Sequence, residues 1–147
     1  MEAVFAKVES DTSRVYVVLL TYFEIYNERL TDLLTTGGAH GKAMDVVCTK
    51  AGVRVRGSTP TPVASAAQAL KLLTEGDGRR ATAATGMNAV SSRSHAVVQM
   101  NISSRLVEEE KGLSAVLTLV DLAGSETVRF IWHLGTKALS ARDIIIF

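Results

Sequence analysis

Two short polar segments carry residue types that could bind a nucleotide phosphate. The first, NAVSSRSH, runs from Asn88 to His95, and the second, DLAGSE, runs from Asp121 to Glu126. Serine hydroxyls bind phosphate oxygens or a hard cation such as Mg²⁺, and an arginine fork matches phosphate or carboxylate. An aspartate at a strand end can order the waters of Mg²⁺, and a glycine three residues later lets a backbone N–H approach a terminal phosphate.

Each segment alone also has a plainer explanation. Asp121 fits an ordinary turn residue after a strand, and NAVSSRSH fits a polar loop before one. Ser94 and His95 do not form a catalytic pair, because neighbours on an extended chain face opposite ways. The residues therefore support no nucleophile, and the phosphate interpretation depends on the two segments acting together.

Three apolar runs predict the strands that position these segments. The run Val15–Tyr26 is rich in β-branched and aromatic residues on both alternating faces, which predicts a strand covered on two sides. Residues 96–103 alternate, with Ala96, Val98, Met100 and Ile102 sharing one face. The run 115–120 predicts another buried strand ending at Asp121, and ligands of nucleotide-binding α/β folds lie at such strand ends.

The remaining elements give a coarse order of strand, hairpin, helix, strand, strand, which favours an α/β sheet with helical cover. Residues 27–34 predict a short helical turn with Leu30, Leu33 and Leu34 inward, and residues 44–48 and 53–55 predict a hairpin. Ser65 predicts a helix start, since Gln68 lies at capping-box spacing, and Gly76 is predicted to end that helix.

Composition excludes several classes of function. The chain has 147 residues, a net charge of +1 and one cysteine, Cys48. So small a charge gives no overall attraction to nucleic acid or to a membrane surface, and one thiol forms neither an internal disulfide nor, alone, a zinc site. The sequence shows no secretory signal and no membrane-length apolar run, so we expect a cytosolic protein. The sequence contains no heptad run, so it gives no prediction of an oligomeric state.

Taken together, the two segments resemble the switch I motif N-x-x-S-S-R-S-H and the switch II motif D-L-A-G-S-E of kinesin motor domains. The segments YFEIYNERLTDLL, GVRVRG and AATGMN resemble further family elements, and AVFAKVES resembles the end of the preceding helix. The resemblance covers about Val15–Glu126. It implies an incomplete kinesin motor fold, which is an α/β, P-loop NTPase-type mixed sheet with helices on both faces. We expect a partial motor domain at 1–127 and a divergent tail at 128–147.

The resemblance implies catalytic roles for four residues. Ser91 and the Gly124 N–H would contact the γ-phosphate of ATP. Arg93 and Glu126 would pair across the closed switches and organise the attacking water. Such a pair forms only when both loops have closed.

The resemblance also implies the cofactors ATP and Mg²⁺. Asn88, Ser91, Ser92, Asp121 and Gly124 would line the nucleotide site. Among them, Ser92 would place its hydroxyl on Mg²⁺ and Asp121 would bind a water of that ion. The implied activity is a microtubule-stimulated ATPase that drives movement, in the cytoplasm and on the microtubule cytoskeleton.

Three basic residues lie where the family has a hairpin that touches tubulin, namely Lys50, Arg54 and Arg56. Positive charges there would steer the chain toward the acidic surface of tubulin. Ordinary solvated charges on an edge hairpin explain them equally well.

The sequence departs from the family pattern in two places. It contains no G-x-x-x-x-G-K-[ST] phosphate-binding loop, because Gly41-Lys42 is followed by Ala43. We therefore expect that this chain alone does not hydrolyse ATP. The sequence after Val128 differs from the family, which predicts a truncated or mis-spliced product or a shifted reading frame. Two alternatives stay open: a non-catalytic tubulin-binding module and an unrelated phosphate-binding NTPase.

Overall fold

The computed structural model describes residues 1–35, 44–49, 52–82, 94–107 and 112–123. Two helices and seven strands lie in these ranges. They are α1 (Glu2–Ser10), β1 (Arg14–Tyr26), β2 (Arg29–Asp32), β3 (Asp45–Thr49), β4 (Gly52–Arg56), β5 (Thr61–Pro62), α2 (Ala66–Thr82), β6 (His95–Leu106) and β7 (Gly112–Asp121).

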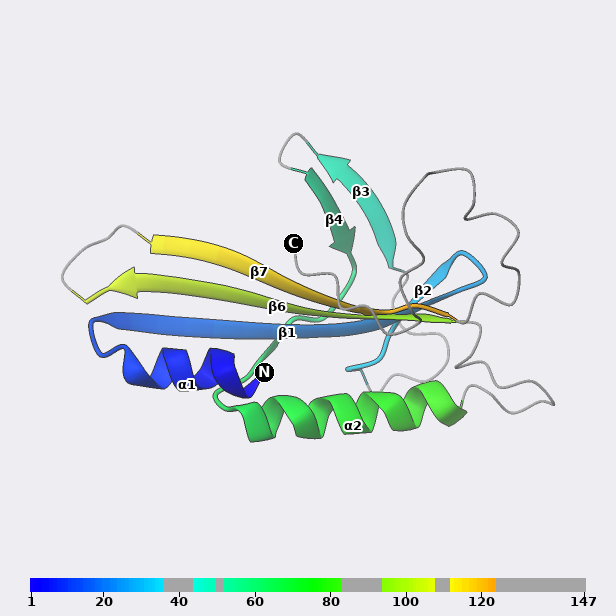
Figure 1. Ribbon diagram of the computed structural model, residues 1–147. Coiled ribbons are helices and arrows are strands. Elements are labelled where there is room, and N and C mark those ends of the chain that lie inside the picture. Colours follow the sequence, from blue (N-terminus) through cyan, green and yellow to red (C-terminus); the bar gives the residue numbers. More distant parts are fainter. Residues whose placement is uncertain (36–43, 50–51, 83–93, 108–111, 124–147) are drawn as a thin grey trace, which may run out of the picture.

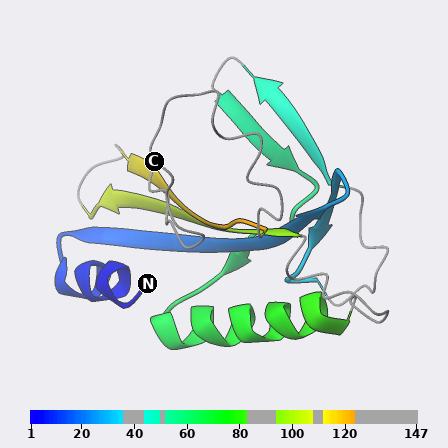
Figure 2. The same ribbon diagram turned by 45° about the vertical axis from the view of Figure 1, so that its right-hand side comes forward.

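The main sheet has five strands, in the order β2-β1-β6-β7, with β5 also pairing to β1. The pairings among the described strands are antiparallel. Helices α1 and α2 both lie under one face of this sheet, α1 near the start of β1 and α2 nearer its end (Figures 1 and 2). Strands β1 and β7 end, and β6 begins, at the same end of the sheet, since Ile25 pairs with His95 and Ala96 pairs with Asp121. Helix α2 ends near the same end of the sheet (Figure 1).

The core lies between the helices and the sheet. It follows the period of two along each strand, because alternate side chains share a face. The predicted inward face of β6 is confirmed: Met100 is fully buried, and Val98 and Ile102 pack against the core. The buried members of this cluster are Phe5, Val18, Leu20, Val63, Ala69 and Met100.

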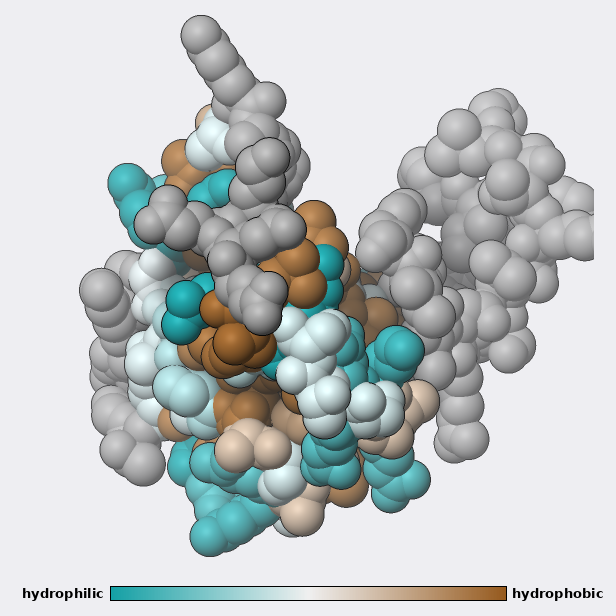
Figure 3. Space-filling view, turned by 90° about the vertical axis from the view of Figure 1, so that its left-hand side faces the viewer, coloured by the Kyte–Doolittle hydropathy of each residue, from teal (hydrophilic) through white to brown (hydrophobic). Residues whose placement is uncertain are grey.

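The strands are less buried than the sequence predicts. Strand β1 is buried on both faces only near its end, and Val15 and Val17 are 45% and 51% exposed. The prediction that residues 115–120 form a buried strand is wrong, because Ala115 and Val116 are exposed and residues 117–120 are only half-buried. The reason is position, since β7 is the last of the described strands in the sheet. Figure 3 views the molecule from the end where β1 and β7 begin and shows exposed apolar residues there.

The predicted helical turn at 27–34 is wrong, because these residues form a β-hairpin. Asn27 and Glu28 have φ angles of 48° and 61°, the left-handed values of a two-residue hairpin turn. Strand β2 then pairs back onto the end of β1. The expected inward position of Leu33 is confirmed, since it is only 2% exposed.

Helix α2 begins as predicted but does not end at Gly76. The Gln68 N–H donates to Ser65 Oγ at 3.2 Å, and Gln68 Oε1 accepts from the Ala64 N–H at 2.8 Å. The helix continues to Thr82. Gly76 allows close packing instead, because a Cβ there would lie 2.5 Å from Tyr22 Cδ1.

The predicted hairpin at 44–55 is confirmed as strands β3 and β4, which form a separate two-stranded sheet. Arg54 pairs with Val47, and Arg56 pairs with Asp45. Neither helix in the described ranges is both long enough and apolar enough to cross a bilayer.

Two glycine substitutions test the contact between α2 and β1. We expect Gly76→Ala to destabilise the chain by about 1–3 kcal/mol, because the new methyl group meets the Tyr22 ring. Gly78→Ala, two residues on, should stabilise by about 0.5–1 kcal/mol, since it meets nothing within 4 Å and alanine favours the helix. Chemical denaturation measures both free energies of unfolding. Equal effects of the two substitutions would contradict the close approach.

Candidate functional site

The described ends of the two polar segments lie side by side. Ser94 and His95 open β6, while Asp121 closes β7 and is followed by Leu122 and Ala123. The Ala123 N–H donates to His95 Nδ1 at 3.0 Å, which fixes the chain after β7 against the start of β6. This hydrogen bond gives His95 a positioning role.

One arginine joins both segments to α2. Arg80 Nε donates to Ser94 Oγ at 3.1 Å, and its Nη2 donates to the Ser94 carbonyl oxygen at 2.7 Å. Arg80 Nη1 lies 3.4 Å from Asp121 Oδ2. The Arg80 side chain is only 10% exposed, so its bonds to Ser94 are made out of water, whereas the Asp121 side chain is 64% exposed. Arg80 therefore fixes the start of β6 and the end of β7 to the same helix.

A buried acid, Glu24 of β1, lies beside this arginine. Glu24 Oε2 is 4.0 Å from Arg80 Nε, and it has no hydrogen-bond partner among the described residues. Desolvation raises the pKa of Glu24, while the Arg80 charge and a hydrogen bond from Ser94 oppose that rise. The Arg80 charge thus offsets part of the cost of burying a carboxylate.

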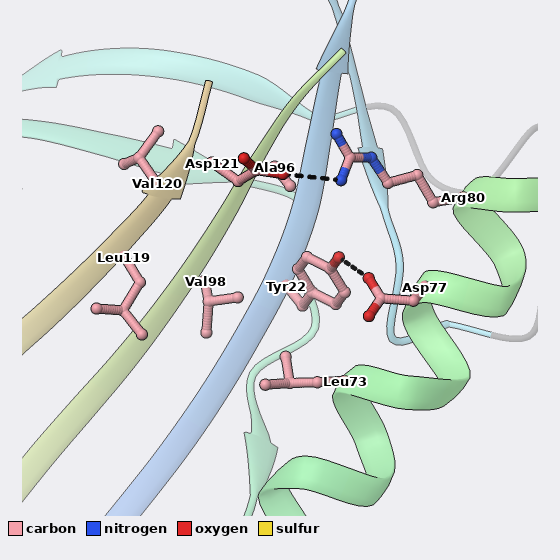
Figure 4. Close-up of a pocket in the computed structure, with 9 residues that line it drawn as sticks. All are labelled: Tyr22, Leu73, Asp77, Arg80, Ala96, Val98, Leu119, Val120 and Asp121. Atoms are coloured by element: carbon pink, nitrogen blue, oxygen red, sulfur yellow. Dashed lines mark hydrogen bonds and ion pairs between the residues drawn. The ribbon is translucent and has the colours of Figure 1, made fainter. Parts of the chain in front are cut away.

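An open cavity of about 290 Å³ lies next to Arg80, between α2 and the sheet (Figure 4). Its walls are mainly apolar, and its polar groups are Asp77, Arg80, Asp121 and the Tyr22 hydroxyl. The Tyr22 hydroxyl donates to Asp77 Oδ1. Burial and this bond raise the pKa of Tyr22, so it stays a neutral donor. The polar end of the cavity coincides with the end of β7.

The structure describes one of the predicted nucleotide-site residues, Asp121. Its side chain is 64% exposed, with one carboxylate oxygen held by Arg80. This position fits a role through the waters of Mg²⁺ rather than direct enclosure of the ion. Within the described ranges, no group of three or more His, Cys, Asp and Glu gathers as a metal site. The other predicted residues, Asn88, Ser91, Ser92, Arg93, Gly124 and Glu126, lie outside the described ranges.

The predicted tubulin-contact residues are described in part. Arg54 and Arg56 are exposed and share one face of β4, because they are two residues apart on a strand. Arg56 forms an exposed ion pair with Asp45 at 3.2 Å, which neutralises part of the basic patch. Lys50 lies outside the described residues.

Sequence reasoning missed Arg80 and Glu24. One signal was available, since Glu24 is the only charged residue in the apolar run 15–26. A single acid in a buried strand needs a partner, because an unpaired buried charge is costly. The identity of that partner was not readable, since Arg80 lies far along the chain.

Comparison with known proteins places this chain in a family. The family model described as the kinesin motor domain matches residues 1–138 of the chain. This match begins before and ends after the predicted segment Val15–Glu126. The chain therefore belongs to the kinesin motor-domain family.

Individual relatives agree with the family match. A kinesin-like protein of Arabidopsis thaliana, KIN-8B, is 37% identical over 145 residues, covering 98% of this chain and 18% of that protein. Kinesin-related protein 10 of Dictyostelium discoideum is 35% identical over 152 residues, covering 98% of this chain and 12% of that protein.

Solved structures confirm the kinesin motor fold. A structure described as a fast kinesin aligns with a TM-score of 0.76 and 36% identity, covering 96% of this chain and 38% of that one. A second structure, named kinesin 6, aligns with a TM-score of 0.66 and 30% identity, covering 79% of this chain and 34% of that one. The chain thus spans well under half of each structure.

A substitution tests whether Arg80 holds the site together. We expect Arg80→Met to cost about 3 kcal/mol in unfolding free energy, because it leaves Glu24 buried without its counter-charge. Adding Glu24→Gln should restore part of that loss, since the double variant buries no charge at this point. Thermal or chemical denaturation of the variants measures these values.

The matched control is Arg79→Met, at the neighbouring helix position. Arg79 is 31% exposed, pairs with Glu75 at 3.6 Å and donates to the Leu33 carbonyl oxygen, but among the described residues it pairs with no buried acid, so its loss should cost only about 1 kcal/mol. Equal costs for the two arginines, or no restoration by Glu24→Gln, would show that Arg80 does not act through the buried acid.

Proposed function

We propose that this chain is the switch-bearing part of a kinesin-type motor domain that couples ATP binding and hydrolysis to movement along microtubules. One observation carries the proposal. Arg80 bonds Ser94, at the end of the first polar segment, and Asp121, at the start of the second. Two segments that must respond to the same phosphate are thereby tied to the same helix.

The residues of such a site would have different roles. Ser92 and Asp121 would hold Mg²⁺, while Asn88, Ser91 and Gly124 would contact the nucleotide. When bound, Mg²⁺ supplies positive charge that offsets the charge of the phosphates. The exposed carboxylate of Asp121 supports its part in this assignment.

The remaining assignments concern closure of the two segments. Arg93 and Glu126 would pair when both segments close on the phosphate, and they would position the attacking water. His95 keeps the chain after β7 close to β6 through the Ala123 N–H. Because Arg80 contacts both segments, a shift in either one acts on the end of α2.

Further assignments follow from the same proposal. The partner is the microtubule, the location is the cytoplasm and its microtubule cytoskeleton, and the cofactors are ATP and Mg²⁺. The motor-like part is 1–127 and the divergent tail is 128–147, of which residues 128–138 lie inside the family match and residues 139–147 outside it. This chain alone lacks the G-x-x-x-x-G-K-[ST] sequence, so its own ATP hydrolysis should stay at background.

The motor proposal makes a prediction about the complete transcript. We expect sequencing of the full-length transcript to reveal an in-frame kinesin-type G-x-x-x-x-G-K-[ST] segment upstream of the codon for Met1. The switch residues need that loop, because it makes most contacts with the α- and β-phosphates. A complete transcript without such a segment would contradict the motor proposal.

A second candidate function is a non-catalytic tubulin-binding module. The observation that favours it is the exposed basic face formed by Arg54 and Arg56 on a separate two-stranded sheet. Charges at such a position would attract an acidic surface without any nucleotide.

Co-sedimentation with microtubules tests the module. We expect the chain to pellet with microtubules at low salt in the presence and absence of ATP, and Arg54→Glu to weaken binding by about tenfold, since it reverses a charge facing the partner. Arg105→Glu makes the same change at an exposed position on β6 and should leave binding nearly unchanged. Release by ATP would favour motor-type coupling over the module. No pelleting, or equal effects of the two variants, would remove the hairpin as a contact.

A further inference from the structure

A buried aspartate holds both stretches of chain that join the β3–β4 hairpin to the main sheet. Asp32, the last residue of β2, is only 8% exposed. Its Oδ1 accepts a hydrogen bond from the Leu34 N–H at 2.8 Å, and its Oδ2 accepts one from the Thr59 N–H at 2.8 Å. Leu34 precedes the hairpin and Thr59 follows it, so one carboxylate fixes both stretches. We call these two bonds the Asp32 clamp.

The clamp lies close to the end of β4. Only Gly57 and Ser58 separate that strand from Thr59. Gly57 has a φ of 93°, a backbone conformation that favours glycine. Among the described strands, β3 and β4 pair only with each other, and the hairpin stands off the face of the main sheet opposite the helices (Figures 1 and 2). The position of Thr59 therefore sets where the β4 side of the hairpin leaves the sheet.

The residue next to Asp32 is itself held by a strand and a helix. The Leu33 N–H donates to the Tyr22 carbonyl oxygen at 2.8 Å, and the Leu33 carbonyl oxygen accepts from Arg79 Nη1. Leu33 is also buried. Contacts with β1 and α2 thus keep the carboxylate of Asp32 in place, and the clamp extends this order to Thr59.

The clamp needs a carboxylate, because both of its partners are N–H donors. A carboxylate accepts at both oxygens, whereas an amide has one oxygen and one NH₂ donor. In Asp32→Asn the amide oxygen should stay on the Leu34 N–H, since asparagine favours this local bond two residues along the chain. The NH₂ group would then face the Thr59 N–H, and that bond would be lost. The substitution opens the clamp on the β4 side and keeps the size of the side chain.

We propose that Asp32 is a positioning residue for a tubulin contact made by the hairpin. It acts by fixing the direction in which Arg54 and Arg56 are presented. The proposal rests on the second candidate function, the tubulin-binding module. Opening the clamp lets the hairpin take several directions, and binding must then select the one that fits, which weakens the measured affinity.

Co-sedimentation with microtubules at low salt compares Asp32→Asn with a charge-matched control. Asp11→Asn removes the same negative charge between α1 and β1. On charge alone, both variants should bind an acidic surface slightly more tightly than the unmodified chain. We expect Asp32→Asn to bind about fivefold more weakly instead, because the loss of one hydrogen bond lowers the population of the fitting direction. Binding by Asp32→Asn as tight as that of Asp11→Asn would overturn the proposal.

Hydrogen exchange of the whole chain measures the clamp itself. In Asp32→Asn the Thr59 amide should exchange about fivefold faster or more, while the Leu34 amide keeps its rate. The Val63 amide, which donates to the Val18 carbonyl oxygen at 3.0 Å, is a further control and should also keep its rate. Faster exchange at all three amides would mean a general loss of structure and would overturn the positioning role, as would an unchanged rate at Thr59.

The two measurements separate failure of the module from failure of the clamp. An unmodified chain that does not pellet removes the tubulin contact and overturns the proposal, and the exchange rate of Thr59 still shows whether the clamp exists. A chain that pellets, with Asp32→Asn binding no more weakly, keeps the module and removes only the role of Asp32.

A second pair of variants opens the clamp without changing Asp32 or the charge of the chain. Thr59→Pro deletes the N–H that donates to Asp32 Oδ2, whereas Thr59→Ala keeps that N–H and removes only an exposed side chain. Thr59→Pro should weaken microtubule binding by about fivefold, and Thr59→Ala should bind like the unmodified chain. Equal binding by these two variants would overturn the proposal, even where Asp32→Asn fails to fold.

Discussion

The guanidinium group of Arg80 fixes three elements that are far apart in the chain. It bonds the start of β6 through Ser94, the end of β7 through Asp121, and lies 4.0 Å from Glu24 of β1. Removing both a cation and a carboxylate from water is costly, so the pair persists only because each supplies the counter-charge of the other. The geometry of the candidate site depends on this contact, since it sets where both polar segments begin and end.

The elements with strong local patterns were predictable from the sequence. The alternation in β6 and the Ser65 cap of α2 depend on residues close together in the chain, so composition and spacing identify them. The turn at Asn27 and Glu28 was not recognised, because Asn-Glu is not one of the dipeptides that favour the left-handed turn. Gly76 was misjudged because its reason, the ring of Tyr22, comes from a different strand.

The candidate site shows the same limit. The strand-end position of Asp121 followed from the apolar run before it. Its contact with Arg80 depends on how α2 lies against the sheet, which no local pattern encodes. The roles of Asn88, Ser91, Ser92, Arg93, Gly124 and Glu126, which lie outside the described ranges, stay predictions. The chain spans only 38% of the fast kinesin structure.

The separation of the β3–β4 hairpin from the main sheet has an evolutionary consequence. Among the described strands, β3 and β4 pair only with each other, and none of their described side chains is fully buried. Substitutions there change surface charge with little effect on folding, so this part of the chain is free to drift or adapt quickly. The residues around Arg80 lack that freedom, because each change there disturbs several partners. Related chains should therefore diverge in the hairpin well before they diverge around the arginine.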